Sequence, residues 1–188
     1  ESVKIIQEEG GNEGGERHHA YLFTEAVGRP EITAPGRRRV FTSAVTASDY
    51  RDRGRPSSWS SAVDNLAADS DGVGEFPRLF VLSAGNTKDD NAWGDYPASL
   101  STNLVHDPGQ AWNAITVGAC TSKVDTDGHA SLVAVAQEGA LSPFTTTSTT
   151  WDSAWPLKPE VVLEGGNVAK DAFSVVGMSS LNLLTVHN

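Results

Sequence analysis

The chain has 188 residues, of which 38% are hydrophobic and 20% charged, a composition typical of one soluble globular domain. Its net charge of -10 argues against nucleic acid and anionic membrane as partners, because either would repel this surface. The single cysteine, Cys120, excludes an intramolecular disulfide and multi-cysteine metal sites, and the sequence shows neither a signal peptide nor a long apolar run.

The first predicted elements are a short strand and a helix. Val3–Ile6 has the β-branched composition of a strand, and residues 10–15 after it are too rich in glycine for anything but a loop. From Arg17 to Val27 apolar residues recur at helical spacing, and we expect Pro30 to end this helix.

The next segments predict a β-α-β unit. Residues 39–46 have the β-branched character of a core strand, and Ser57 and Ser58 offer an N-cap to a following helix. The apolar side chains of this helix form one continuous stripe: Trp59, Ala62, Val63, Leu66 and Ala67. The run Leu79–Ala84 then predicts a strand buried on both faces of a parallel sheet. The whole pattern predicts an α/β fold with a mostly parallel sheet.

Asn86 follows this strand at the end where α/β sheets place their ligands. Gly85 before it has no side chain, which allows a substrate or another backbone to approach closely. A carboxamide in this position offers N–H donors to a developing negative charge without titrating itself. Two interpretations stay open: an oxyanion donor, or a turn in which Asn86 caps its own backbone.

The second half of the chain predicts loops around a few strands. The polar window after Asn86 predicts a solvated loop, Tyr96–Ala98 a turn, and Ala114–Ala119 another buried strand. Residues 143–167 form a loop-rich region, and Leu181–Val186 is a strand candidate. Because the sequence contains neither a repeat nor a linker, we expect residues 1–188 to form a single domain.

The histidines allow two further hypotheses. One is a metal site at His18, His19 or His129, although neighbours in a helix point in different directions and make poor co-ligands. The other is a hydrolase of a different kind, but no G-x-S-x-G nucleophile motif occurs. We expect His106 and Asp107, in a polar loop, to be capping or solvated residues, and we expect no metal or other cofactor.

Four short motifs resemble, in the same order, those of the subtilisin-like serine peptidases. They are Ser83-Ala84-Gly85-Asn86, similar to S-A-G-N; Tyr96-Pro97-Ala98 followed by Ile115–Ala119, similar to Y-P-A and I-x-V-G-A; Leu141–Thr145, similar to L-S-x-F-S; and Lys158–Val162 with Gly165, similar to K-P-D-V-x-A-P-G. The resemblance implies a three-layer α/β fold with a mostly parallel sheet and flanking helices, and it places residues 1–188 in the central part of the family's catalytic domain.

The resemblance also implies roles for a few residues. Asn86 would be a catalytic residue that donates its side-chain N–H to the tetrahedral intermediate. Two groups would bind substrate: Ser83, Ala84 and Gly85 as a wall of the pocket for the residue preceding the cut bond, and Ser43, Ala44 and Val45 as a partner for the extended substrate backbone.

The family's catalytic triad is missing from this sequence, because D-[ST]-G, H-G-T-x-[VM]-A and G-T-S-[AM]-A do not occur in it. We therefore expect the parent protein to be a serine endopeptidase that hydrolyses a polypeptide substrate, and this chain alone to be inactive. The alternative is a non-catalytic peptide-binding or scaffold domain derived from the same fold.

The resemblance bears on partners as well. A sheet that lacks the family's Asp-bearing strand would leave strand edges unpaired, which predicts rearrangement, cover by a loop or self-association. Residues 54–60 resemble a bacterial, intracellular subgroup of the family whose members occur beside ATPases. This implies an ATPase partner and a cytoplasmic location.

Overall fold

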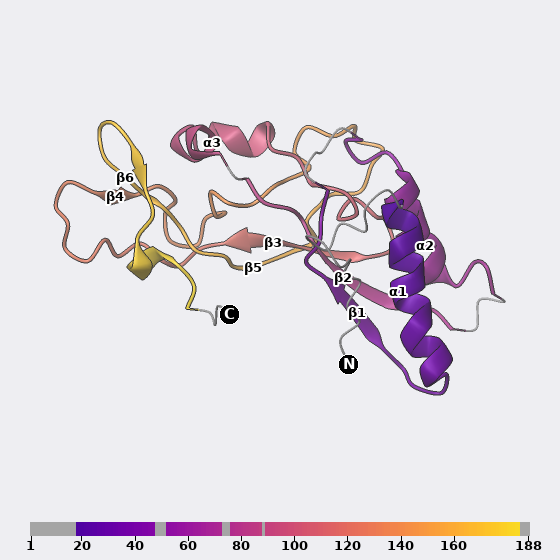
Figure 1. Ribbon diagram of the computed structural model, residues 1–188. Helices are drawn as coiled ribbons and strands as arrows, with labels where there is room; N and C mark the ends of the chain where they lie inside the picture. Colours follow the sequence, from indigo (N-terminus) through magenta and orange to yellow (C-terminus); the bar gives the residue numbers. More distant parts are fainter. Residues whose placement is uncertain (1–17, 48–51, 73–75, 88, 185–188) are drawn as a thin grey trace.

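The computed structural model describes residues 18–47, 52–72, 76–87 and 89–184, and its centre is a four-stranded sheet (Figure 1). The strands lie in the order β1 (Val40–Ser43), β2 (Leu79–Ser83), β3 (Ile115–Cys120) and β5 (Val161–Glu164). Each neighbouring pair is parallel. The predicted α/β fold with a mostly parallel sheet and flanking helices is therefore confirmed, while Val3–Ile6 and residues 10–15 lie outside the described residues.

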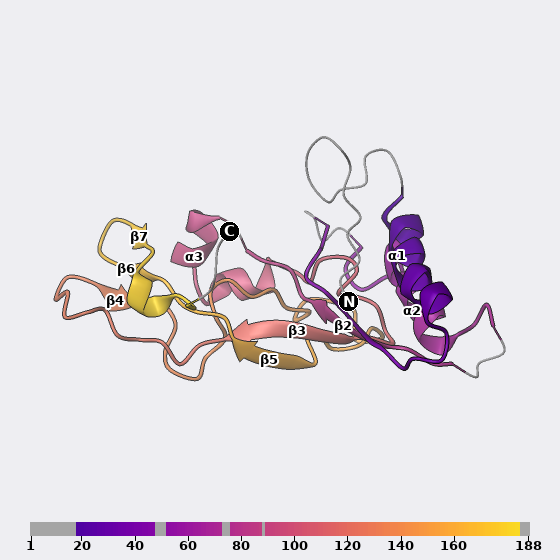
Figure 2. The same ribbon diagram turned by 60° about the horizontal axis from the view of Figure 1, so that its bottom comes forward.

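Two helices cover one face of this sheet at β1 and β2, and Figure 2 shows them side by side. They are α1 (His19–Thr33) and α2 (Ser58–Ala68). Trp59 and Val63 of α2 are buried in one cluster with Phe80 and Leu82 of β2. Ser57 caps α2 as predicted, because its hydroxyl accepts a hydrogen bond of 2.9 Å from a backbone N–H of the first turn. The predicted apolar stripe is the core on this side of the sheet.

The opposite face of the sheet presents apolar side chains that are exposed in the described part of the chain. Side chains alternate between the two faces along a strand, so register partners share a face. Val40 and Leu79 are such partners, at 60% and 44% exposed, and Leu163 on the same face is 64% exposed. Burial is thus one-sided among the described residues, whereas purely parallel sheets normally bury both faces.

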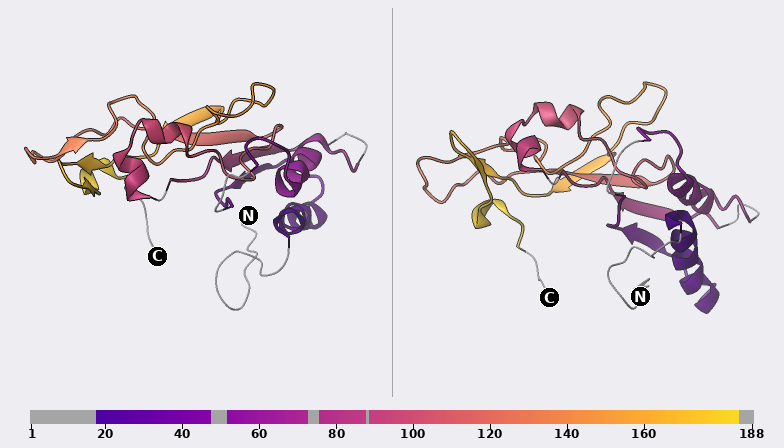
Figure 3. Two further views of the ribbon diagram at one scale, coloured as in Figure 1. Left: turned by 90° about the horizontal axis from the view of Figure 1, so that it is seen from above. Right: turned by 45° about the horizontal axis from the view of Figure 1, so that its top comes forward.

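Beyond β2 the chain forms short elements. These are α3 (Asp90–Gly94), η1 (Ala98–Ser101), β4 (Val133–Ala134), β6 (Ala169–Lys170), β7 (Val175–Val176) and η2 (Ser179–Leu181). β4, β6 and β7 form a small antiparallel sheet at the end of the molecule away from α1 and α2 (Figure 3). Within the described ranges, none of the helices has the length and apolar character that a membrane crossing requires.

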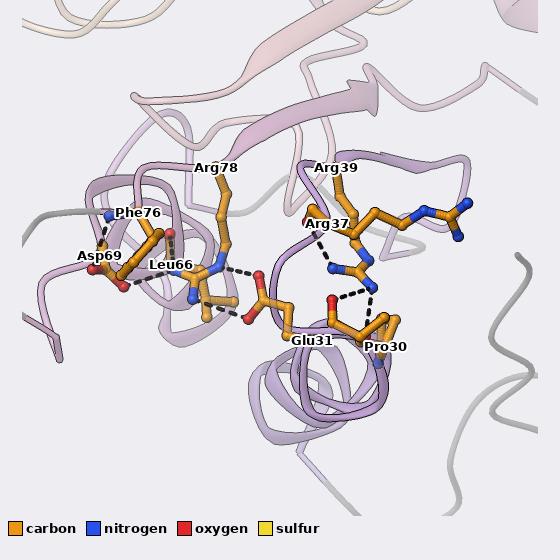
Figure 4. Close-up of polar contacts among 9 residues, drawn as sticks. Pro30, Glu31, Arg37, Arg39, Leu66, Asp69, Phe76 and Arg78 are labelled. Atoms are coloured by element: carbon orange, nitrogen blue, oxygen red, sulfur yellow. Dashed lines mark hydrogen bonds and ion pairs between the residues drawn. The ribbon is translucent and has the colours of Figure 1, made fainter.

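The prediction that Pro30 ends the first helix is wrong, because α1 continues through it to Thr33. An internal proline removes one helical N–H, but the carbonyl groups of Pro30 and of the C-cap Ala34 still accept hydrogen bonds. The backbone N–H of Ala34 donates to the Pro30 carbonyl at 3.0 Å. The Arg39 guanidinium donates to the carbonyls of Pro30 at 2.6 Å and Ala34 at 3.0 Å (Figure 4). These bonds stabilise the end of the helix beyond the proline.

Other predicted boundaries also differ from the structure. The solvated loop expected after Asn86 contains α3, whose N-cap Asp89 accepts a backbone hydrogen bond of 2.9 Å. The predicted strand at residues 39–46 ends at Ser43, and the loop-rich region contains β5. Leu181–Val186 is not a strand, because Leu181 is fully buried within η2 and residues 182–184 have no regular structure. Residues 185 and 186 lie outside the described part.

One polar network joins α1, α2 and the start of β2 (Figure 4). Arg78 donates to both carboxylate oxygens of Glu31 in α1, at 2.6 and 3.0 Å. It also donates to Asp69 at the end of α2 at 3.0 Å and to the carbonyl of Leu66 at 2.9 Å. The side chains of Arg78 and Asp69 are only 17% and 10% exposed. A shielded, two-pronged ion pair of this kind contributes more to stability than a surface pair.

We expect Arg78→Met to lower the free energy of unfolding by about 2–4 kcal/mol, because Glu31 and the largely buried Asp69 each lose a charged donor. The control is Arg29→Met, which removes the ion pair of Arg29 with Glu25 on the surface of α1 and should cost less than about 0.5 kcal/mol. Urea unfolding followed by tryptophan fluorescence measures both changes. Equal losses in the two variants would contradict this role of the network.

Candidate active site

The two segments predicted to bind substrate leave the sheet at the same edge. Ser43 ends β1 and is the register partner of Leu82, so residues 43–45 and 83–86 follow neighbouring parallel strands. Ser43 is half-buried, whereas Ala44 and Val45 are exposed. The Val45 N–H donates to the Ser43 hydroxyl at 3.3 Å, a local contact at the end of β1. This edge, formed by strand carboxyl ends, is where α/β sheets bind ligands.

Asn86 lies at this edge with an exposed side chain. Gly85 before it has a φ of +99°, in the left-handed region that favours glycine, and this turn follows directly after β2. Among the described residues, the Asn86 carboxamide has no hydrogen-bond partner. The hydrogen-bonding groups of this side chain are therefore not used by the part of the chain that the structure describes.

The chain directly after Asn86 is anchored. The N–H of Thr87 donates to the carbonyl of Phe144 at 2.9 Å, and its hydroxyl donates to the carbonyl of Thr145 at 3.3 Å. The indole N–H of Trp93 donates to the Thr87 carbonyl at 3.0 Å. Thr87 is only 5% exposed. An exposed amide is thus attached to a buried, hydrogen-bonded neighbour, which restricts its backbone.

The wall expected at Ser83, Ala84 and Gly85 is also held firmly. Ala84 and Gly85 are buried and Ser83 is half-buried. The N–H of Ala84 donates to the carbonyl of Val117 at 2.9 Å. The Ala84 carbonyl accepts two bonds, from the Thr146 hydroxyl at 2.7 Å and from the backbone N–H of His106 at 2.9 Å. Sequence reasoning identified neither of these two supports.

The prediction of a solvated or capping role is wrong for His106, which is 7% exposed. Its Nδ1 lies 2.9 Å from the carbonyl oxygen of Ala47. Asp107 does support a cap, because its carboxylate accepts a bond of 2.7 Å from the hydroxyl of Ser57, the N-cap of α2. Burial raises the pKa of Asp107, and the hydrogen bond from Ser57 opposes that rise. Nothing near His106 in the sequence indicates this burial, since its partners lie in distant segments.

The other histidines described by the structure lie elsewhere. His18, His19 and His129 are exposed, and the ring of His19 packs against Trp59 with 4.7 Å between centroids. Within the described ranges, no three His, Cys, Asp or Glu side chains lie close enough together to hold a metal ion. The proposed metal site therefore has no support from these residues.

A carboxylate at the carboxyl ends of β3 and β5 serves the structure. Glu164 accepts hydrogen bonds from the N–H of Ser122 at 2.6 Å, from its hydroxyl at 2.7 Å, and from the N–H of Gly166 at 2.9 Å. Partial burial acts to raise the pKa of Glu164, but these hydrogen bonds outweigh burial and lower the pKa from 4.5 to about 2. The ionised side chain thus joins two loops at the edge of the sheet.

Comparison with known proteins bears on the whole chain. The family model described as the subtilase family matches residues 1–188. A search of the curated proteins finds no match. The family match includes the motif-bearing segments at residues 83–86 and 141–145 and extends over the N-terminal part as well.

We expect Glu164→Gln to lower stability at pH 7, because the amide cannot replace a carboxylate that accepts three hydrogen bonds. The pKa is depressed in the folded state, so the contribution of Glu164 is complete above pH 4.5 and is lost as the pH falls toward about 2. The difference in urea midpoint between wild type and variant should therefore shrink between pH 6 and pH 3. Glu138→Gln, at an exposed glutamate, should show no such convergence.

Proposed function

We propose, since this chain belongs to the subtilase family, that it forms the central part of the catalytic domain of a serine endopeptidase. Such enzymes cut peptide bonds with a serine nucleophile, a histidine base and an aspartate that orients the histidine. None of the family's three triad motifs occurs in this sequence. The chain then supplies an oxyanion donor and substrate-binding walls, and it is inert without the missing Asp, His and Ser.

Asn86 is the donor in this proposal. The observation that carries it is the exposed carboxamide at the carboxyl end of β2, attached to the buried and hydrogen-bonded Thr87. An oxyanion donor must be in place before the negative charge develops, because reorganisation during the reaction would cost part of the stabilisation. The side chain meets this requirement in part: its backbone is fixed, and its N–H groups are not used by the described residues.

The substrate backbone would lie along the edge formed by residues 43–45 and 83–85. Ala44 and Val45 are exposed next to the end of β1, where an extended peptide can add main-chain hydrogen bonds. Ser83, Ala84 and Gly85 would form one wall of the pocket for the residue preceding the cut bond. A polypeptide is the substrate class that such an edge recognises.

We expect Asn86→Ala to lower kcat about 100- to 1000-fold in the protein made from its complete open reading frame, with little change in KM. That magnitude is the one known for the equivalent donor in subtilisin. The matched control is Asn91→Ala, an exposed asparagine in α3 that should leave kcat unchanged. The measurement is hydrolysis of a fluorogenic peptide at saturating concentration.

A fluorophosphonate probe separates this proposal from the alternative of a non-catalytic binding domain. The complete protein should be labelled on its nucleophilic serine, and the chain of residues 1–188 should not. Absence of labelling in the complete protein would favour the binding domain. Labelling of the 188-residue chain at the rate of an active site would show that its predicted inertness is wrong.

The isolated chain is also proposed to self-associate through β1. Within the described residues β1 pairs with β2 alone, which leaves its other edge open for a further strand. The exposed apolar side chains of Val40 and Leu79 lie beside this edge. The net charge of -10 opposes association, so added salt should strengthen it.

We expect sedimentation velocity of the isolated chain to show a mass that rises with concentration and with salt. The double substitution Val40→Lys and Thr42→Lys should reduce this association, because lysines on an edge strand hinder pairing. Leu157→Lys with Phe173→Lys adds the same charge at exposed positions far from β1 in the chain and should leave the association in place. A monomer at every concentration would rule the proposal out.

A further inference from the structure

His106 and Asp107 lie between the two segments that leave β1 and β2. The strands are paired directly as far as Ser43 and Leu82. Beyond that point, the N–H of His106 donates to the carbonyl of Ala84 at 2.9 Å, and the N–H of Ala47 donates to the carbonyl of Asp107 at 2.7 Å. The two segments thus no longer bond to each other here, because a two-residue spacer bonds to both.

The imidazole of His106 fills the space beside Gly85. A methyl group added to Gly85 would lie only 2.5 Å from Cγ of His106 and 2.8 Å from its Nδ1. The same Nδ1 lies 2.9 Å from the carbonyl oxygen of Ala47, so it carries the hydrogen of this bond. The ring therefore contacts both segments, and with an exposure of 7% it closes the space between them.

The segment that carries this ring is anchored by contacts of Asp107 and Gly109. The carboxylate of Asp107 accepts the hydroxyl hydrogen of Ser57, the N-cap of α2, at 2.7 Å. Gly109 passes so close to β2 that a methyl group on it would lie 2.6 Å from the carbonyl oxygen of Ser83. Residues 106–109 are thus packed against both a helix end and a strand, and moving the ring aside would break these contacts.

We infer that His106 is a specificity-determining residue that restricts the residue preceding the cut bond to small side chains such as Gly, Ala and Ser. This inference rests on the proposed function, in which that residue is bound beside the wall formed by Ser83, Ala84 and Gly85. A large side chain entering there would meet the imidazole, and overpacking of a fixed site is unfavourable. A small side chain extends little beyond its own backbone and so avoids most of this contact.

The test uses the protein made from the complete open reading frame and peptides that differ only in the residue preceding the cut bond. Wild type should cut after Ala with a kcat/KM at least ~10-fold higher than after Phe, because a filled pocket discriminates by size. His106→Ala should raise the Phe to Ala ratio of kcat/KM at least ~10-fold. His106→Phe keeps the bulk without the hydrogen bond to Ala47, and it should keep the preference for Ala.

A ratio is the chosen readout because a loss of structure lowers kcat/KM for both peptides together. Should His106→Ala not fold, the cleavage profile of wild type on a denatured protein mixture, read by mass spectrometry, decides the question by itself. Small residues before the cuts would support the inference. Cuts after Phe or Leu as frequent as after Ala would overturn it and leave the peptidase function standing. No cleavage and no fluorophosphonate labelling would overturn the function and the inference together.

Discussion

The candidate site depends on the parallel pairing of β1, β2 and β3. Parallel strands have their carboxyl ends at one edge of the sheet, so Ser43 and Ser83 end next to each other although many residues separate them in the chain. The Ala84 carbonyl shows the consequence. It leaves the ladder at the end of β2 and accepts donors from Thr146 and His106, two residues of distant loops. The end of β2 thus gathers two distant loops at Ala84, two residues before Asn86.

The elements that could be predicted from the sequence are those whose buried side chains form a pattern within one short segment. β2 and β3 are short apolar runs, and the stripe of α2 follows helical spacing from its N-cap Ser57. β5 is not predicted, because its apolar run of only three residues, Val161–Leu163, stands close to two prolines and two glycines. The small antiparallel sheet consists of two-residue strands, and the buried Asn167 links the chain beside it to the carbonyls of Lys123 and Ala136. Such a link across the chain leaves no periodic pattern.

The candidate site likewise contains residues that a local sequence pattern predicts and one residue, His106, that such a pattern does not predict. Asn86 and the residues before it follow from one apolar run that ends in Gly85, a signal contained in a few neighbouring residues. Among the described residues, the position of His106 depends on long-range contacts with Ala47, Ala84 and Gly85. A histidine followed by an aspartate in a polar loop is normally solvated, and burial here results from the separation of β1 and β2 beyond Ser43. Only the tertiary structure shows that separation.

Asp107 explains why α2 matters for this edge of the sheet. Its burial raises its pKa, which means that the charged carboxylate is disfavoured in the folded protein and costs stability at neutral pH. A neutral side chain would avoid that cost. The carboxylate, however, accepts bonds from Ser57 at 2.7 Å and from Gln110 at 3.4 Å, and so ties the start of α2 to the segment that carries His106. The residue is therefore better explained by the position it gives to residues 106–109 than by a gain in stability. Through the bond between Ser57 and Asp107, helix α2, which packs in the core against β2, also fixes the position of His106 and Asp107 between the segments that follow β1 and β2.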